Sequence, residues 1–180
     1  MRVLLSKFLL NLAGWKLGPV GEDVPKCVVC VAPHTSNWDF IVGKLFYSAL
    51  DRDAGFLIKK DWFFFPFILL FSWLGGVPVD RDKRTSVTDQ MVEEFAKRDS
   101  FHLGITPEGT RKKVTEWKKG FYFIALKANV PIVLAYLDYG KKEAGVKAIF
   151  YPTGDFEKDI ETIRSYYKGV QGKNAENFVE

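Results

Sequence analysis

Short apolar runs rich in β-branched residues alternate along the chain with longer stretches in which apolar residues recur at helical spacing. The short runs predict strands at 26–32, 55–58, 76–79, 101–105, 131–137 and 146–151. The longer stretches predict helices at 38–50, 87–98, 118–128 and 155–168. This alternation predicts an α/β fold, in which a mostly parallel central sheet is flanked by helices within one layer-type domain.

The first residues predict an amphipathic N-terminal helix. Its apolar positions share one side of a helical wheel and are Leu4, Leu5, Phe8, Leu12 and Trp15. Such a helix either packs on its own domain or lies on an anionic lipid surface, and the pattern leaves both open. Lys7 and Asn11 interrupt the apolar run, so a cleaved export signal is not expected.

A second apolar stretch runs from Trp62 to Val79 without a charge. Pro66 and the Gly-Gly-Val-Pro sequence at 75–78 limit a helix to 62–74, which is about 20 Å long, whereas a bilayer core is about 30 Å thick. The stretch is therefore not expected to span a membrane. Its aromatic residues suit a surface that dips into one leaflet, the wall of an acyl-chain tunnel, or a core helix.

Composition narrows the class of protein. A length of 180 residues, with 47% hydrophobic and 27% charged residues, excludes a disordered chain and a polytopic membrane protein. We expect an N-terminal membrane-associating helix over 1–20, one domain over 21–170, and a solvated tail over 171–180. The aromatic share of 16% is high for one domain, so part of it is expected to face lipid.

Charge and cysteine content limit the partners. The net charge of +4 is too mild and too evenly spread to indicate a nucleic-acid partner. Cys27 and Cys30 give no disulfide scaffold and indicate a reducing compartment. A zinc site built from them with His34 and His102 is not expected, because positions i and i+3 of a strand face opposite sides.

One candidate for chemistry lies where the 26–32 strand ends. The neutral imidazole of His34 can take a proton from a hydroxyl, and the carboxylate of Asp39 can fold back to fix its tautomer. From spacing alone, a purely structural role for this pair stays open. Ser36 or Asn37 is well placed to cap the following helix.

Two further turns follow strands. After the strand at 101–105, the amide of Gly109 and the guanidinium of Arg111 can hold an oxyanion, with Glu108 placed to orient the arginine. After the strand at 76–79, Arg81 is a second candidate anion ligand. The alternative readings are an ordinary turn before a solvated basic helix, and a surface arginine paired with a neighbouring aspartate.

Together these segments resemble the lysophosphatidic acid acyltransferase family, the glycerolipid acyltransferases marked by an HxxxxD motif. His34 and Asp39 match that motif, Gly76 and Arg81 match the family's GxxxxR block, and residues 107–111 match its PEGTR block. A VPI strand at 130–133 matches the fourth block, so the resemblance covers roughly 32–137. The chain departs from the usual pattern at the block edges, at Thr106, Lys112 and Leu134.

The resemblance implies an enzyme of phospholipid biosynthesis that moves a fatty acyl group from an acyl thioester to the free hydroxyl of a lysophospholipid. The acceptor it implies is 1-acylglycerol-3-phosphate, which gives phosphatidic acid, and the donor is acyl-CoA or acyl carrier protein. His34 is then the general base and Asp39 orients it, without an acyl-enzyme, a metal or another cofactor. The implied acceptor-binding residues are Arg81, Glu108, Gly109, Thr110 and Arg111.

Two alternatives stay open: acylation of another lyso-acceptor such as an aminolipid, and a non-catalytic peripheral lipid-binding module. A serine hydrolase is disfavoured because no serine lies in a G-x-S-x-G elbow. The expected location is the cytoplasmic face of a membrane, contacted by residues 1–15 and 62–73.

Overall fold

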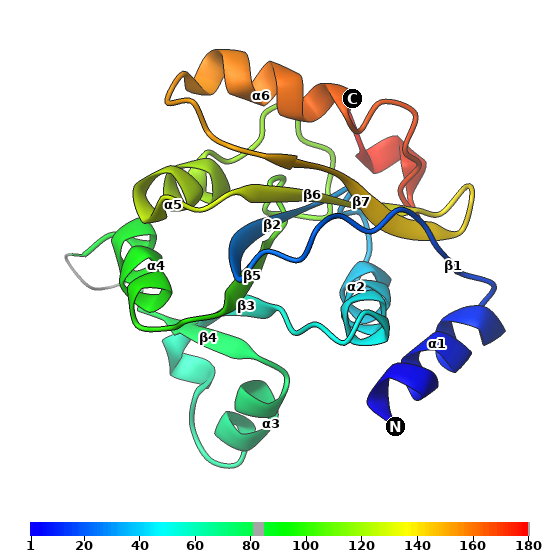
Figure 1. Cartoon of the computed structure of the whole chain (residues 1–180), viewed down its shortest axis with the longest axis horizontal. Helices are drawn as coiled ribbons and strands as arrows, with labels where there is room; N and C mark the ends of the chain where they lie inside the picture. Colours follow the sequence, from blue (N-terminus) through cyan, green and yellow to red (C-terminus); the bar gives the residue numbers. More distant parts are fainter. Residues whose placement is uncertain (81–84, 180) are drawn as a thin grey trace.

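The protein is described by a computed structural model that covers residues 1–80 and 85–179. A seven-stranded sheet has the order β1-β7-β6-β2-β5-β3-β4 (Figure 1). The strands are β1 Lys16–Leu17, β2 Lys26–Ala32, β3 Gly55–Lys59, β4 Gly76–Val79, β5 Phe101–Ile105, β6 Ile132–Asp138 and β7 Glu143–Phe150. The strands from β2 to β6 are mutually parallel, and β7 runs antiparallel to β6. The predicted mostly parallel α/β sheet is therefore confirmed.

Helices cover both faces of this sheet (Figure 1). They are α1 Arg2–Leu12, α2 Trp38–Ala49, α3 Phe67–Trp73, α4 Val87–Ala96, α5 Gly120–Ala128 and α6 Phe156–Ser165, with 3-10 turns at Lys60–Trp62 and Ala175–Asn177. Side chains of α4, α5 and α6 form one core with the sheet, and those of α1 and α2 form the other.

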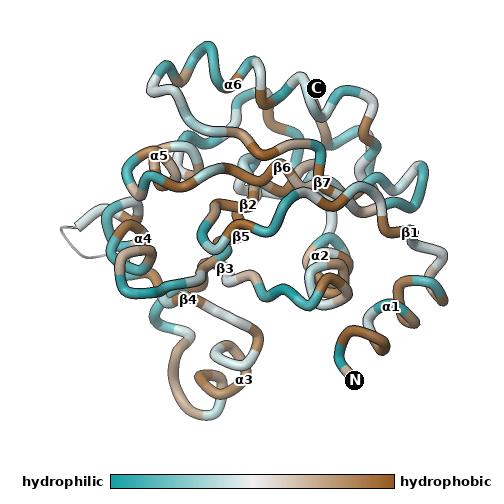
Figure 2. Tube along the Cα trace, in the orientation of Figure 1, coloured by the Kyte–Doolittle hydropathy of each residue, from teal (hydrophilic) through white to brown (hydrophobic). Residues whose placement is uncertain are grey.

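The alternation of side chains along β2 divides these two cores. Val28 and Cys30 face α4 and α5, whereas Cys27 and Val29 face α2. The two thiols therefore lie on opposite faces of the sheet, as the strand period predicts. Hydrophobic residues fill the central strands and also occur on α1 and α3 (Figure 2).

The strand order decides where functional loops can meet. β2 pairs with β5 on one side and with β6 on the other, although these strands are far apart in the chain. Cys30 is opposite Ile105 and Leu134, so the three strands end at the same edge of the sheet. Loops that leave parallel strands at their carboxyl ends, where the order reverses, commonly form binding sites.

The helix in the 62–74 stretch lies within the predicted limit and is shorter than it. A short 3-10 turn ends at Trp62, and α3 begins only at Phe67, directly after Pro66. Proline cannot donate a backbone hydrogen bond and disfavours helical geometry in the residue before it, so the helix starts after the ring. No residue of α3 is buried.

The predicted N-terminal helix is present as α1, but most of the apolar side of its helical wheel faces away from the domain. Ser6 and Leu10 face the domain, and the hydroxyl of Ser6 donates a hydrogen bond to that of Ser48 on α2 over 2.8 Å. Leu4, Phe8 and Leu12 are more than half exposed. Trp15 lies beyond the helix end and is buried, so its predicted place on the apolar face of the helix is wrong. Within the described part of the chain, no helix is long and apolar enough to cross a bilayer.

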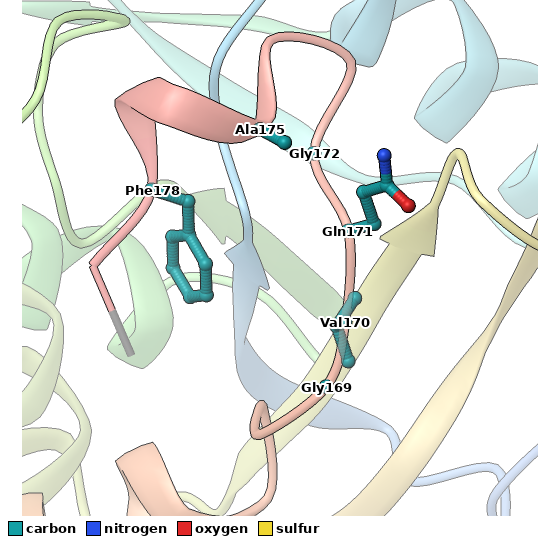
Figure 3. Close-up of a pocket in the computed structure, with 6 residues that line it drawn as sticks. All are labelled: Gly169, Val170, Gln171, Gly172, Ala175 and Phe178. Atoms are coloured by element: carbon teal, nitrogen blue, oxygen red, sulfur yellow. The ribbon is translucent and has the colours of Figure 1, made fainter.

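The C-terminal segment is more than the solvated tail predicted from residue 171. Phe178 packs against the core, and the side chain of Asn174 donates a hydrogen bond to the carbonyl of Thr35 over 2.8 Å. The segment also forms the wall of a small pocket next to Gly172 (Figure 3). Residues 173–176 are exposed, as the prediction of a solvated tail has it.

The fully buried ring of Phe121 on α5 gives a test of this packing. We expect Phe121→Ala to lower the free energy of unfolding by about 3–5 kcal/mol, because it leaves a cavity in a close-packed core. Phe65→Ala is the matched control, since that ring is 78% exposed, and should change the free energy by less than about 0.5 kcal/mol. Denaturant titration of both variants measures the difference, and equal losses would contradict the described core.

Candidate active site

His34 lies in the loop that joins β2 to α2, and Asp39 lies in the first turn of α2. The strand ends at Ala32 and the helix begins at Trp38, so the loop makes a tight turn at the carboxyl edge of the sheet. The hydroxyl of Ser36 accepts a hydrogen bond from the backbone N–H of Trp38, whereas Asn37, the N-cap residue of α2, makes no capping hydrogen bond with its side chain. The turn brings the ring of His34 against Asp39, with 3.2 Å between Nδ1 and Oδ2.

The carboxylate of Asp39 is almost fully buried, and its oxygens accept four hydrogen bonds. Oδ2 accepts from the backbone N–H groups of Thr35 at 2.8 Å and Ser36 at 2.9 Å, and from His34. Oδ1 accepts from the hydroxyl of Tyr139 at 2.7 Å. Burial alone raises the pKa of Asp39, but these hydrogen bonds outweigh it and hold the pKa below its usual range. Asp39 is therefore ionised at neutral pH.

The ionised carboxylate determines what the ring of His34 can do. Because Oδ2 only accepts, Nδ1 of His34 carries the proton and donates it to the bond. Nε2 of His34 has no hydrogen-bond partner within residues 1–80 and 85–179, and the side chain is 15% exposed. A neutral imidazole with a free Nε2 can accept a proton from a bound hydroxyl.

Glu108 approaches the same loop from β5. Its Oε1 accepts a hydrogen bond from the backbone N–H of His34 at 2.9 Å. Its Oε2 is buried, with no partner among the residues that the structure describes. Burial raises the pKa of Glu108 above its usual range. Glu108 thus holds the backbone of His34 in place. Within the described residues, no hydrogen bond or ion pair joins Glu108 to the exposed Arg111.

The rest of this turn faces solvent. Gly109 has a φ of +63°, which glycine adopts without strain, and a Cβ at this position would lie 2.7 Å from Cδ of Lys118. Thr110 is half-buried, and its hydroxyl accepts from the backbone N–H of Lys112. Arg111 is exposed and forms no ion pair with any described residue. Its guanidinium is therefore available to an anion.

The other candidate anion ligand, Arg81, lies outside the described residues. Its predecessor Asp80 is held in place by Gln90, whose side-chain oxygen accepts from the Asp80 amide at 3.1 Å. The structure therefore brings together His34, Asp39 and Glu108, and places the turn with Gly109, Thr110 and Arg111 beside them through Glu108.

Sequence reasoning missed two residues that support the loop. Tyr139 comes directly after β6 and reaches Asp39, and Asn174 bonds twice to Thr35, at its hydroxyl and its carbonyl. The place of Tyr139 after a strand was the available signal, because the other candidates also follow strands. Nothing local to the sequence around Asn174 indicates its contact.

No group of three metal-ligating side chains occurs among residues 1–80 and 85–179. His102 lies in β5, and its Nε2 is 2.6 Å from the carbonyl of Val24, so this imidazole is a buried, hydrogen-bonded residue of the core.

Comparisons with known proteins agree with this arrangement. Residues 20–137 match the family model described as Acyltransferase. The human protein named 1-acyl-sn-glycerol-3-phosphate acyltransferase beta is 26% identical over 139 residues, which make up 74% of this chain and 49% of that protein. The chain therefore spans about half the length of this curated relative.

A solved structure shares the fold. The 1-acyl-sn-glycerophosphate (LPA) acyltransferase PlsC from Thermotoga maritima matches with a TM-score of 0.61 and 19% identity, over 91% of this chain and 74% of that one. The family match covers well over half of the chain and includes the His34–Asp39 loop and the turn at Gly109. The chain therefore belongs to the Acyltransferase family.

Proposed function

We propose that the protein transfers a fatty acyl group from an acyl thioester to the free hydroxyl of a lysophospholipid, with 1-acylglycerol-3-phosphate as acceptor and phosphatidic acid as product. The observation that carries the proposal is the ring of His34, which a buried, ionised Asp39 holds while no described residue bonds to Nε2. A module that only binds lipid has no use for a base held in this way. The names of the human relative and of the Thermotoga maritima protein support the acceptor.

The chemistry proceeds by direct transfer. Nε2 of His34 takes the proton of the acceptor hydroxyl as the oxygen forms a bond to the thioester carbonyl carbon. Asp39 stabilises the imidazolium formed in this step, because the charge develops next to a carboxylate. The tetrahedral intermediate collapses, the carbon–sulfur bond breaks, and the leaving thiolate takes the proton back from the imidazolium. The products are the ester and the free thiol of the carrier.

The acceptor's phosphate is proposed to bind at the turn after β5. Arg111 offers two parallel N–H donors that match phosphate oxygens, and the conformation of Gly109 lets a backbone approach the ligand closely. Thr110 adds a hydroxyl, and Arg81 is the proposed second guanidinium. Glu108 links this turn to His34, so its contact sets the relative position of headgroup and base.

The acyl thioester is the proposed co-substrate, either acyl-CoA or acyl carrier protein, and the proposed reaction needs no other cofactor. Both donors present the same thioester carbon to the acceptor, so the chemistry at His34 is the same for each. The choice between them rests on contacts with the carrier, which a panel of both donors tests directly.

Because the proposed acceptor is a membrane lipid, the protein has to reach a membrane surface. The exposed apolar side chains within 1–15 and 62–73 suit such a surface. Phe65 and Trp73 in the second segment are 78% and 81% exposed, and Leu12 in the first is 73% exposed. Large apolar side chains of this kind are unfavourable in water and favourable at a lipid interface. We propose peripheral binding to the cytoplasmic face, by these two segments.

His34→Ala tests the base. We expect it to lower kcat/KM for acyl transfer by about 10²–10⁴-fold, because the proton acceptor is lost. Binding to liposomes should stay within a few-fold of the wild type, since His34 is not on the exposed apolar segments. Mass spectrometry of the product with a panel of lyso-acceptors, aminolipids included, and with both donors measures the rate and identifies the acceptor. Full activity in the variant refutes the role of His34.

Arg111→Ala tests the headgroup site. The KM for a lysophosphatidic acid acceptor should rise by about tenfold or more, whereas the KM for the donor should change little, because the guanidinium is proposed to contact only the phosphate. Lys113→Ala is the control, since it removes a neighbouring exposed cation from the same loop. A rise confined to the donor KM would show that the phosphate site is misplaced.

A paired change on α1 tests the membrane surface. Phe8→Ser combined with Leu12→Ser should weaken binding to anionic vesicles by about tenfold or more, because each substitution removes a large apolar side chain from the interface. Tyr151→Ser removes an equally exposed aromatic ring outside both segments and serves as the control. Vesicle co-sedimentation measures the difference, and equal binding by all three proteins argues against a membrane role for α1.

A further inference from the structure

Tyr139 occupies a special place beside Asp39. It is the first residue after β6, and β6 pairs with β2, so its side chain enters the site from the carboxyl edge of the sheet. Its hydroxyl is 2.7 Å from Oδ1 of Asp39. The other three donors to this carboxylate all bond to Oδ2. Within the described residues, Tyr139 is thus the donor that holds Oδ1.

Tyr139 is itself held in place at its ring and at its backbone. Its edge-to-face contact with Trp15 has 4.8 Å between ring centroids and an interplanar angle of 86°. Its backbone N–H donates to the carbonyl of Gln171 at 2.8 Å. Burial and the neighbouring Asp39 raise the pKa of Tyr139 well above its usual value, so the hydroxyl keeps its proton. A fixed, protonated phenol is a one-way donor to the carboxylate.

We propose that Tyr139 is a positioning residue for acyl transfer, which acts on His34 through Asp39. The inference rests on the proposed function and deepens it. With Oδ1 tied to Tyr139, the plane of the carboxylate is fixed and Oδ2 points at Nδ1 of His34. The proton then stays on Nδ1, and Nε2 stays free to act as the base.

Loss of the Tyr139 hydroxyl shifts the pKa of Asp39 in one direction. Within the described residues, the titratable groups that face Asp39 are His34 from the loop before α2, Tyr139 from the turn after β6, and Glu108 from the turn after β5. Removing the Tyr139 bond raises the pKa of Asp39, because one of the interactions that favour the ionised form is gone. The ionised carboxylate is lost as the pH falls through its pKa, so a variant with a raised pKa loses activity at a higher pH.

Tyr139→Phe tests this relay, because the ring and its contact with Trp15 are kept. We expect kcat to fall by about tenfold, the loss typical of one hydrogen bond to a charged group, with the KM for donor and acceptor within about twofold of the wild type. The ratio of wild-type to variant rates should widen as the pH is lowered. Tyr151→Phe removes an exposed hydroxyl elsewhere and should leave every parameter unchanged.

A second readout needs no activity. The chain has two histidines, so ¹⁵N-histidine labelling gives two sets of ring-nitrogen signals, which report where each proton sits. In Tyr139→Phe the His34 signals should move toward the Nε2-protonated tautomer, while those of His102 stay in place. Unchanged His34 signals overturn the proposal, whatever the rate. Absence of acyl transfer in the wild type refutes the proposed function instead, and the ring-nitrogen signals still decide the role of Tyr139.

Discussion

An ionised carboxylate buried beneath the edge of a sheet is the constraint on which the site depends. A buried charge is strongly unfavourable unless hydrogen bonds replace the water it has lost. Asp39 obtains those bonds from two backbone amides, one imidazole and one phenol. The loop between β2 and α2 must curl so that Thr35 and Ser36 point their N–H groups inward, and the same curl brings the ring of His34 against Oδ2. The fold of this loop and the orientation of the base therefore have one cause.

The strand order then distributes two tasks around this carboxylate. The segment after β2 supplies the dyad of His34 and Asp39, the turn after β5 supplies Glu108, and the turn after β6 supplies Tyr139. These three strands are neighbours. Glu108 and Tyr139 hold opposite ends of the dyad, one at the backbone of His34 and the other at Oδ1 of Asp39. Arg111 belongs to the same turn as Glu108 but is exposed. The groups proposed for chemistry are thus fixed by burial, and a group proposed for headgroup recognition keeps the freedom to adapt to its ligand.

Local sequence could predict the parts of this structure that depend on local physics. Apolar runs predicted the positions of most strands. The spacing of His34 and Asp39 indicated a hydrogen-bonded pair across one turn. The contacts of Tyr139 with Asp39 and of Asn174 with Thr35 join residues 100 and 139 positions apart, and no periodicity encodes them. The helical wheel placed Trp15 on a helix face, because it reads only local spacing. The contact that buries Trp15 beside Tyr139 depends on the tertiary fold. α3 starts directly after Pro66, inside the predicted limit of 62–74, because a proline disfavours helical geometry in the residue before it.

Trp15 connects α1, the proposed membrane-binding helix, to the candidate active site. It follows α1, whose exposed leucines and phenylalanine are proposed to lie in lipid, and its ring supports Tyr139, which supports Asp39. The backbone N–H of Trp15 bonds to the carbonyl of Leu10, and that of Lys16 to the carbonyl of Lys142, so the helix end is tied to the turn that carries Tyr139. A lipid acceptor must present its hydroxyl to Nε2 while its chain stays in the bilayer. The contacts that run from the proposed membrane-binding helix through Trp15 and Tyr139 to Asp39 thus link the position of the base to that helix, and so to the lipid surface on which it is proposed to lie.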